Sequence, residues 1–287
     1  MLKINHNTLS ISKEHSMKRS LIVFLVVLVC STFCKAQKTY VLAVGISDYK
    51  EINDLNLCEN DALSFASLME AAGAEVNVIK GSLATHENIL TSLRGLLAKA
   101  KSEDGVIFYF SGHGYEGGFC CWDMATNSPS LNQGKLGKGI EKNRVNTVNR
   151  YYGGLSYAEL QVLFRNCRAT KKIVIADACF SGGLKKGNHI NTSVQSAKKG
   201  DLIFFLSSRP DETSLELAGS NNGLFTTYLL NGLLGGSDKN SDGLITIGEL
   251  YDYVYCGVTE YANKIPHSQH PVLWGRFNEK MPILKIK

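Results

Sequence analysis

The sequence lacks the excess of positive charge that would point to a nucleic-acid partner. Its 287 residues contain 31 Lys and Arg against 26 Asp and Glu, which gives a formal charge of +5. Residues 1–36 hold five of the basic side chains and one of the acidic ones, so the rest of the chain carries only +1. A basic stripe with interleaved aromatic residues is missing as well. We therefore expect no nucleic-acid partner.

A hydrophobic run long enough to span a bilayer is also missing. The apolar run at residues 21–30 (LIVFLVVLVC) has ten residues, about half of what a transmembrane helix needs. It follows a basic pair at residues 18–19 and precedes Cys34 and Ala36, small residues at the two positions read for cleavage, which is the anatomy of a secretory signal peptide. We therefore predict a signal peptide over residues 1–36, cleaved before Gln37.

This leader predicts where the protein resides. Met17 stands just before the basic pair, so residues 1–16 would be an N-terminal extension if translation starts at Met17. After cleavage, residues 37–287 would be exported to the periplasm or the cell exterior, with no stable membrane association. The alternative is an uncleaved membrane anchor, which the shortness of the apolar run disfavours.

The cysteines lack the spacing of a zinc knuckle or a disulfide framework. Eight are present, and the six after residue 36 are Cys58, Cys120, Cys121, Cys167, Cys179 and Cys256. An exported protein could form disulfides. If one of the six must stay a free thiol, however, the other five cannot all pair.

What the sequence does contain is an alternation of strand-like and helix-like segments. Apolar runs predict strands at 40–45, 75–79, 106–110, 173–176 and 202–206, and apolar spacing predicts helices at 60–72, 85–101, 156–166, 224–234 and 249–261. Residues 117–154, rich in glycine and polar residues, predict a long loop or insertion, and residues 181–200 predict a polar loop. The alternation predicts one α/β domain over residues 37–287, a mostly parallel sheet with helices on both faces.

Two short segments directly follow predicted strands. Residues Ser111–Gly114 (SGHG) come after the strand at 106–110, and residues 177–183 (DACFSGG) come after the strand at 173–176. In open α/β sheets, ligands bind at the carboxyl ends of the strands. If these two strands are parallel neighbours, His113 and Cys179 lie side by side at that edge.

A cysteine beside a histidine suits nucleophilic catalysis. The imidazole of His113 can remove the proton of the Cys179 thiol and later protonate the leaving amine. The backbone N–H groups of Gly114 and Cys179 could then form an oxyanion hole. A lone cysteine or histidine is usually structural, but their joint placement after two strands favours a catalytic pair.

These residues resemble the two hallmark blocks of caspase-like cysteine peptidases. The Asp-Ala-Cys form at 177–179 is similar to metacaspases and bacterial caspase homologues, in a clan that also includes legumain and clostripain. The resemblance covers roughly residues 38–275, because residues 41–62 (VLAVGISDY followed by CENDA) and 206–225 (LSSRPDETSLE followed by GLF) also match. It implies a caspase-like three-layer α/β/α fold and a cysteine endopeptidase that acts on protein or peptide substrates.

The resemblance also implies a specificity. Metacaspases cut after Arg or Lys, and Asp61 and Asp177 stand where the acidic residues of that family's S1 pocket stand. Two carboxylates in a dry pocket suit a guanidinium, which binds them in bidentate pairs. Ser207 and Ser208 begin the matching segment at 206–216, and we expect them to contact substrate. The structural alternatives are a strand-end cap for Asp177 and a helix N-terminal charge for Asp61.

Processing is expected in one region. The polar loop at 181–200 joins the catalytic block to the next predicted strand, the position at which this family is commonly processed. Its basic residues are Lys185, Lys186, Lys198 and Lys199. Self-cleavage, if it occurs, is expected there.

A second motif is typical of a calcium site. Residues 238–249 match the twelve-residue EF-hand loop at every specified position, with Gly243 at the sharp turn. The expected ligands are Asp238, Asn240, Asp242, Leu244 (through its carbonyl), Thr246 and Glu249. Ca²⁺ would be structural or regulatory, and the peptidase chemistry itself requires no cofactor. The alternative is a polar turn without a metal.

The sequence leaves three functions open. The first is an active cysteine endopeptidase, favoured because both His113 and Cys179 are present. The second is a catalytically silent, calcium-binding interaction module with a caspase fold. The third is a clostripain-like or legumain-like cysteine hydrolase, which fits Asp61 and the segment at 206–216 less well.

Overall fold

Apolar strand segments far apart in the chain assemble into one central sheet. The computed structural model describes residues 37–115, 117–125, 152–178, 202–209, 211–217 and 219–286. The predicted signal peptide at 1–36, Cys179 and the loop at 181–200 lie outside these residues. No described helix has the length and apolar character to cross a bilayer.

The central sheet has six strands in the order β10-β8-β7-β3-β1-β2. They are β1 (Thr39–Gly45), β2 (Glu75–Lys80), β3 (Gly105–Gly112), β7 (Lys171–Ala178), β8 (Ile203–Leu206) and β10 (Val272–Trp274). All pairs are parallel except β10 with β8. The continuous apolar runs in β1, β3 and β7 are explained by their position, since inner strands of a parallel sheet are buried on both faces.

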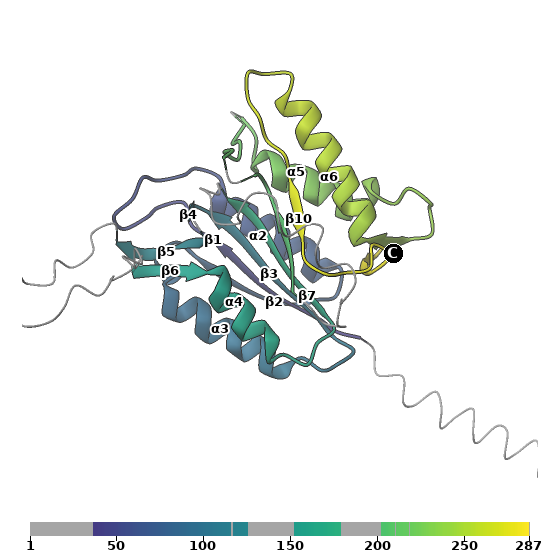
Figure 1. Cartoon of the computed structure of the whole chain (residues 1–287), viewed down its shortest axis with the longest axis horizontal. Coiled ribbons are helices and arrows are strands. Elements are labelled where there is room, and N and C mark those ends of the chain that lie inside the picture. Colours follow the sequence, from purple (N-terminus) through teal and green to yellow (C-terminus); the bar gives the residue numbers. More distant parts are fainter. Residues whose placement is uncertain are drawn as a thin grey trace, which may run out of the picture. The chain divides into compact units, whose positions relative to one another are not determined.

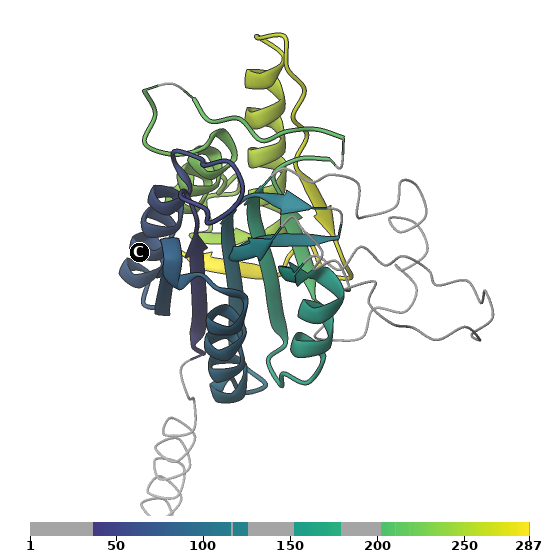
Figure 2. The same cartoon turned by 90° about the vertical axis from the view of Figure 1, so that its left-hand side faces the viewer.

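Helices cover both faces of this sheet (Figure 1 and Figure 2). Helices α3 (His86–Lys99) and α4 (Tyr157–Arg165) pack on one face, and α2 (Cys58–Ala71), α5 (Leu224–Asn231) and α6 (Ile247–Ala262) pack on the other. Alternate residues of β1 serve the two cores, with Leu42 in the first and Val41 in the second. Helix α3 begins at the predicted cap, where the Thr85 hydroxyl accepts a hydrogen bond from the Asn88 N–H at 3.3 Å. The predicted three-layer α/β/α class is confirmed.

The predicted loop at 117–154 is wrong at both ends. Strands β4 (Gly114–Tyr115), β5 (Gly118–Ala125) and β6 (Tyr152–Ser156) form a small antiparallel sheet, and residues 126–151 lie outside the described part. Phe119 and Cys121 of β5 are fully buried in the core beneath α3 and α4. The glycines beside this strand are the reason that the sequence predicts a loop here. Gly117, which has a φ of +97°, forms the turn before the strand.

The C-terminal part contains elements that the apolar pattern did not predict. The helix expected at 224–234 is observed in two parts. Helix α5 ends at Asn231, and the π-helical turn η3 (Gly232–Gly236) follows it, in which Gly235 has a φ of +116°. Strand β9 (Leu244–Thr246) pairs antiparallel with β11 (Pro282–Lys285). Both strands are too short to show a period. The remaining described element is the short 3₁₀ helix η1 (Gly81–Leu83).

The cysteines in the described residues do not form disulfides. Cys58, Cys120, Cys121, Cys167 and Cys256 are free thiols, and the first four are buried. The four buried ones serve as small apolar core residues, as buried free cysteines usually do.

Candidate active site

The two segments with catalytic residue types follow adjacent, parallel strands. β3 and β7 pair over their full length, and the last pair in register is Gly112 with Ala178. His113 is the next residue after the first strand, and Cys179 is the next residue after the second. The expectation that these strands are neighbours is confirmed, while Cys179 itself lies outside the described residues.

The imidazole of His113 is held by a backbone carbonyl. Its Nε2 lies 2.8 Å from the carbonyl oxygen of Asn53. Because a carbonyl oxygen only accepts hydrogen bonds, Nε2 must carry the proton. In the neutral imidazole this leaves Nδ1 as the basic nitrogen. Nδ1 is therefore the ring nitrogen that can accept a proton, and Asn53, which orients the ring, was not predicted from the sequence.

Tyr49 holds the backbone and the ring of the same histidine. The His113 N–H donates to the Tyr49 hydroxyl at 2.7 Å, and the two ring centroids are 5.0 Å apart. Burial raises the pKa of Tyr49 well above its usual value, so the phenol stays neutral. Its proton points to the carbonyl of Cys120. A Cβ at Gly112 would clash with the Tyr49 hydroxyl and the Phe110 ring, so any other residue there would displace one of these side chains.

Asp61 lies in the first turn of α2 and is 2% exposed. Its Oδ1 accepts hydrogen bonds from the Gly223 N–H at 2.9 Å and the Asn222 Nδ2 at 3.0 Å. Its Oδ2 accepts a hydrogen bond from the Ser111 hydroxyl at 2.8 Å. Ser111 immediately precedes the Gly112–His113 pair, so Asp61 is tied to the end of β3 that leads into His113.

Asp177 lies at the end of β7, two residues before Cys179, and is 6% exposed. Its Oδ2 accepts hydrogen bonds from the Thr226 N–H at 3.1 Å and the Thr226 hydroxyl at 2.8 Å, and its Oδ1 accepts a very short one from Ser214. The carboxylate is therefore anchored to α5 and to the segment after β8.

The two carboxylates converge on one glycine. A Cβ at Gly223 would lie 2.7 Å from Asp177 Oδ2 and 3.3 Å from Asp61 Oδ2. The structure thus brings together the two acidic residues that were predicted to share a pocket. Asp61 does more than supply a helix N-terminal charge, because its oxygens accept hydrogen bonds from three residues of two other segments.

Burial of like charges dominates the electrostatics of this pair. Desolvation, followed by the nearby charge of Asp177, raises the pKa of Asp61 to about 7, against the opposing hydrogen bonds. Desolvation also raises the pKa of Asp177, while the hydrogen bonds from Ser214 and Thr226 oppose the shift. Two close, buried carboxylates resist simultaneous ionisation. A bound cation would relieve that repulsion.

Ser207 and Ser208 are buried, and their hydroxyls bond the backbone. The Ser207 hydroxyl accepts from the Ala178 N–H at 3.1 Å and donates to the Ala178 carbonyl at 3.0 Å. The Ser208 hydroxyl donates to the carbonyl of Glu212 at 3.3 Å. Ser207 therefore braces the residue before Cys179. Substrate contact by these two serines stays a prediction, as does an oxyanion hole made by Gly114, which begins β4 opposite Phe119.

The EF-hand-like loop lies between η3 and α6. Gly243 has a φ of +77°, as the sharp turn of such a loop requires, and its N–H donates to Asp238 Oδ2 at 3.0 Å. Asp242 Oδ1 accepts from the Leu244 N–H at 2.8 Å, and Asn240 Oδ1 accepts from the Asp242 N–H at 2.9 Å. The loop therefore satisfies most of its acceptors with its own backbone.

The remaining loop oxygens are differently engaged. Glu249 caps α6 by accepting hydrogen bonds from the N–H and the hydroxyl of Thr246, at 3.1 and 2.7 Å. Asp238 Oδ1 is buried and has no hydrogen-bond partner. Within the described part of the chain, no three His, Cys, Asp or Glu side chains gather in a metal-ligating group. The loop has the residues of a calcium site, but its carboxylates do not converge.

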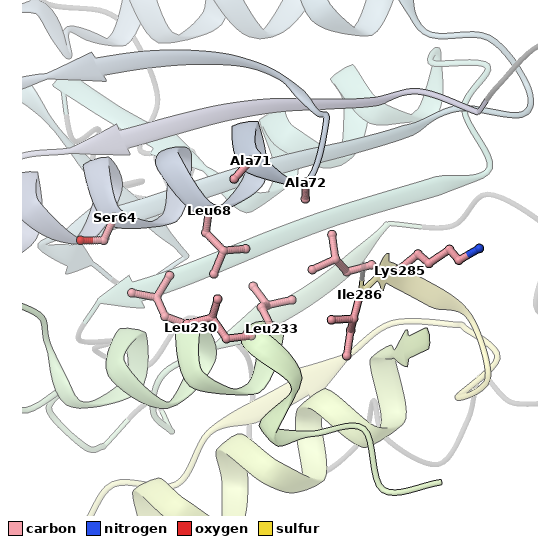
Figure 3. A pocket seen from close by; sticks show the side chains of 10 residues that line it. Ser64, Leu68, Ala71, Ala72, Leu230, Leu233, Lys285 and Ile286 are labelled. Carbon is pink, nitrogen blue, oxygen red and sulfur yellow. The ribbon is translucent and has the colours of Figure 1, made fainter. Parts of the chain in front are cut away.

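A cavity of about 340 Å³ lies apart from these residues (Figure 3). Its lining is mostly apolar and comes from α2 from Ser64 onward, from α5 and η3, and from β11, with Leu68, Ala72 and Leu233 among the lining residues. Ala72 follows Asp61 by 11 positions, which is about 16 Å along a helix. Most of the lining therefore lies away from the strand ends, although Ser64, three positions after Asp61, also belongs to it.

Known proteins resemble the chain in sequence pattern and in fold. A sequence profile of the family described as caspase domain matches residues 38–281. A crystal structure of a protein from Geobacter sulfurreducens superposes with a TM-score of 0.57 at 17% identity, over 87% of this chain and all of that one. At this identity the similarity concerns the fold alone. None of the curated proteins that were compared matches the chain in sequence.

Proposed function

The chain belongs to the caspase-domain family, and from this premise we propose that it is an active cysteine endopeptidase with Cys179 as nucleophile and His113 as general base. The observation that carries the proposal is the register of β3 with β7, which ends at the residues just before the two. The hydrogen bond from His113 Nε2 to the Asn53 carbonyl supports the role of base, because it leaves Nδ1 unprotonated.

The proposed reaction has two stages. His113 takes the thiol proton of Cys179, and the thiolate attacks the scissile carbonyl carbon to form a tetrahedral oxyanion. The N–H groups of Gly114 and Cys179 would stabilise this oxyanion. His113 then donates its proton to the leaving amine as the C–N bond breaks, which leaves a thioester. Water, deprotonated by His113, attacks the thioester and releases the acid product and the thiol.

The acidic pair supports cleavage after Arg or Lys. Asp61 and Asp177 share one buried site near the ends of β3 and β7, and their mutual repulsion favours a cationic side chain. An aspartyl side chain at the same place would add a third like charge. Basic P1 residues are therefore the proposed specificity.

A peptide panel tests the function. Protein starting at Gln37 should cleave fluorogenic peptides with Arg or Lys at P1, and neither Cys179→Ala nor His113→Ala should retain more than about a thousandth of that rate, because nucleophile and base act as a unit. Both variants should keep the melting temperature of the wild type. Full activity in either variant would contradict the mechanism.

A catalytically silent, calcium-binding interaction module remains the second candidate. It is favoured if no peptide is cut and Cys179 does not react with an electrophile. The profile match to the caspase domain argues against a clostripain-like or legumain-like hydrolase.

We also propose that Ca²⁺ binds at residues 238–249. The specific observation is the buried Asp238 Oδ1, which lacks a partner at the first ligand position of the motif. Asp242 and Asn240 are exposed and close to it in sequence, while Glu249 would have to turn away from Thr246 to reach the ion. Pairing of β9 with β11 braces the loop in the place where EF-hands normally pair with each other. Calorimetric titration with CaCl₂ tests this directly.

Export and self-processing complete the proposal. The basic pair and short apolar run at 18–30 support a cleaved leader and an exported enzyme. The lysines of the loop at 181–200 would fit the proposed preference of the acidic pocket for basic P1 residues. Mass spectrometry of wild type and Cys179→Ala tests both, through the mature N-terminus and through fragments that end in that loop.

A further inference from the structure

The segment between α6 and β10 reaches the acidic pair through one buried amide. Gln269 is fully buried. Its Oε1 accepts from the Leu215 N–H at 3.0 Å, and its Nε2 lies 3.1 Å from the Ser207 carbonyl and 3.0 Å from the Ser214 hydroxyl. A polar side chain buried this deeply is held by its hydrogen bonds.

The orientation of this amide is fixed by its partners. A backbone N–H can only donate, so the atom facing Leu215 must be the oxygen. A backbone carbonyl can only accept, so the atom facing Ser207 must be the nitrogen. The nitrogen therefore also donates to Ser214, whose hydroxyl oxygen acts as the acceptor.

This assignment decides where the Ser214 proton goes. A hydroxyl has one proton, and the Gln269 amide already occupies an acceptor position on Ser214 Oγ. The hydroxyl proton is thus directed to Asp177 Oδ1, with which Ser214 makes a very short hydrogen bond. Gln269 and Ser214 form a directed chain of donors that ends on the carboxylate.

A second chain of donors reaches the same carboxylate from the sheet. The Tyr109 hydroxyl lies 2.6 Å from the Thr226 hydroxyl, which lies 2.8 Å from Asp177 Oδ2. Burial raises the pKa of Tyr109 well above its usual value, so its proton stays available. Since Thr226 gives its proton to the carboxylate, Tyr109 donates to Thr226. Each oxygen of Asp177 thus receives a hydroxyl proton.

We propose that Gln269 is a positioning residue for substrate specificity, which acts through Ser214 to hold Asp177 ionised and oriented toward a cationic P1 side chain. The proposal rests on the proposed function of the acidic pair. Donors to a buried carboxylate favour its charged form. Without the Gln269 amide, the hydroxyl proton of Ser214 would no longer be directed to Asp177. The pair of Asp61 and Asp177 would then hold a proton more tightly and bind a cation less well.

Two substitutions separate orientation from packing. Gln269→Leu removes the amide with little change in volume. Gln269→Glu keeps an acceptor for Leu215 but offers a second acceptor to Ser214, so the Ser214 proton would turn away from Asp177. His267→Ala is the matched control, because His267 contacts the same loop through the carbonyl of Thr213, at 2.9 Å.

The test uses binding in a Cys179→Ala background as well as turnover. Calorimetry with a peptide ending in arginine should show about tenfold weaker binding for Gln269→Leu and for Ser214→Ala, and no further loss in the double variant. Gln269→Glu should weaken binding of the arginyl peptide at least as much. The same peptide ending in norleucine should bind all variants with equal affinity. In the active enzyme, KM for Arg substrates should rise while kcat stays within twofold.

The outcomes are separable from those for the proposed function. If the wild type cuts no peptide but Cys179→Ala binds the arginyl peptide, catalysis fails and the inference is still measured by binding. Unchanged binding in Gln269→Leu, an additive loss in the double variant, or an equal loss in His267→Ala would overturn the inference. Failure of Cys179→Ala to bind the arginyl peptide would overturn both the basic specificity and the inference.

Discussion

The molecule has two acidic regions that are built in opposite ways. Asp61 and Asp177 are almost fully buried, and their hydrogen-bond donors come from residues far away in sequence, such as Ser111 and Thr226. In the loop at 238–249, Asp242 is exposed and the carboxylates bond mainly to N–H groups of the same loop. The first region is preorganised by the fold, whereas the carboxylates of the second do not converge.

This difference predicts different responses to the loss of a charge. Cation binding at the preorganised pair depends on both carboxylates, since truncating one partner of a buried hydrogen-bonded charge pair, here a carboxylate facing a bound cation, costs about 2–5 kcal/mol. A locally bonded loop should influence stability more than catalysis, because its nearest packed elements are α6 and β11 rather than β3 and β7. The predictions below follow this contrast from its largest expected effect to its smallest.

The largest effect is expected from Asp177→Asn. Loss of one buried carboxylate should raise KM for Arg substrates on the order of 100-fold. The matched change in the other region, Glu249→Gln, should leave KM within about twofold. Steady-state kinetics on an arginyl substrate measures both. Similar losses in the two variants would mean that the regions are not functionally distinct.

A pH dependence of cation binding should follow from the buried pair. Because the pKa of Asp61 is about 7 in the free protein, part of the protein must release a proton before the pair can meet a cation with both charges. Affinity for an arginyl peptide in the Cys179→Ala variant should therefore rise as pH increases from 6 to 8. Calorimetry in two buffers of different ionisation enthalpy should detect the released proton.

The control for this pH dependence is Asp61→Asn. The amide cannot titrate, so affinity should be weaker at all pH values and nearly flat from 6 to 8. The charges of Asp177 and Glu216 also face this site, and both remain in the control. A slope that persists in Asp61→Asn would assign the proton to another group.

The calcium loop should reveal itself in the melting temperature. At a Ca²⁺ concentration 100 times the dissociation constant, binding to the folded form alone adds about 2.7 kcal/mol. For a domain of this size that is a rise of about 5–10 °C. Glu249→Gln should lose most of the rise, while Asp61→Asn should keep it. A calcium-dependent rise in Glu249→Gln equal to that of the wild type would exclude the loop as its source.

The smallest expected effect is on the pH dependence of the free energy of unfolding. The folded-state pKa of Asp61 is raised from 3.8 to about 7, so the folded protein holds a proton that the unfolded chain releases. This contribution to stability is complete below about pH 4 and is lost as pH rises toward 7. Denaturant unfolding of Asp61→Asn should show a flatter pH profile over that range than the wild type, without calcium. A steeper pH profile in Asp61→Asn than in the wild type would contradict the upward shift of the Asp61 pKa.

The two regions also differ in how far the sequence predicts them. The loop at 238–249 was found from spacing alone, because its ligands follow one another in the chain. The pairing of Asp61 with Asp177 depends on the resemblance to metacaspases, because the hydrogen bonds that hold each of them in place span 49 to 162 residues. Spacing alone would have left each as a structural carboxylate.

The fold was predicted where apolar runs are long and was missed where glycine or short elements interrupt them. Strands β3 and β7 were placed, with His113 at the end of β3, because inner parallel strands are continuously apolar. The glycine and polar residues around strands β5 and β6 predict a loop instead. The carbonyl of Asn53 and the amide of Gln269 carried no sequence signal, since any residue supplies a carbonyl and a glutamine is usually exposed.

The most direct test of the account is covalent labelling of Cys179. Wild-type protein should be treated with matched peptide chloromethyl ketones that differ only in a P1 residue of Arg, norleucine or Asp, and then mapped by mass spectrometry. The account predicts modification of Cys179 by the arginyl reagent, at least tenfold faster than by the norleucyl one, and loss of labelling in His113→Ala. Equal or faster labelling by the aspartyl reagent, or an unmodified Cys179, would contradict it.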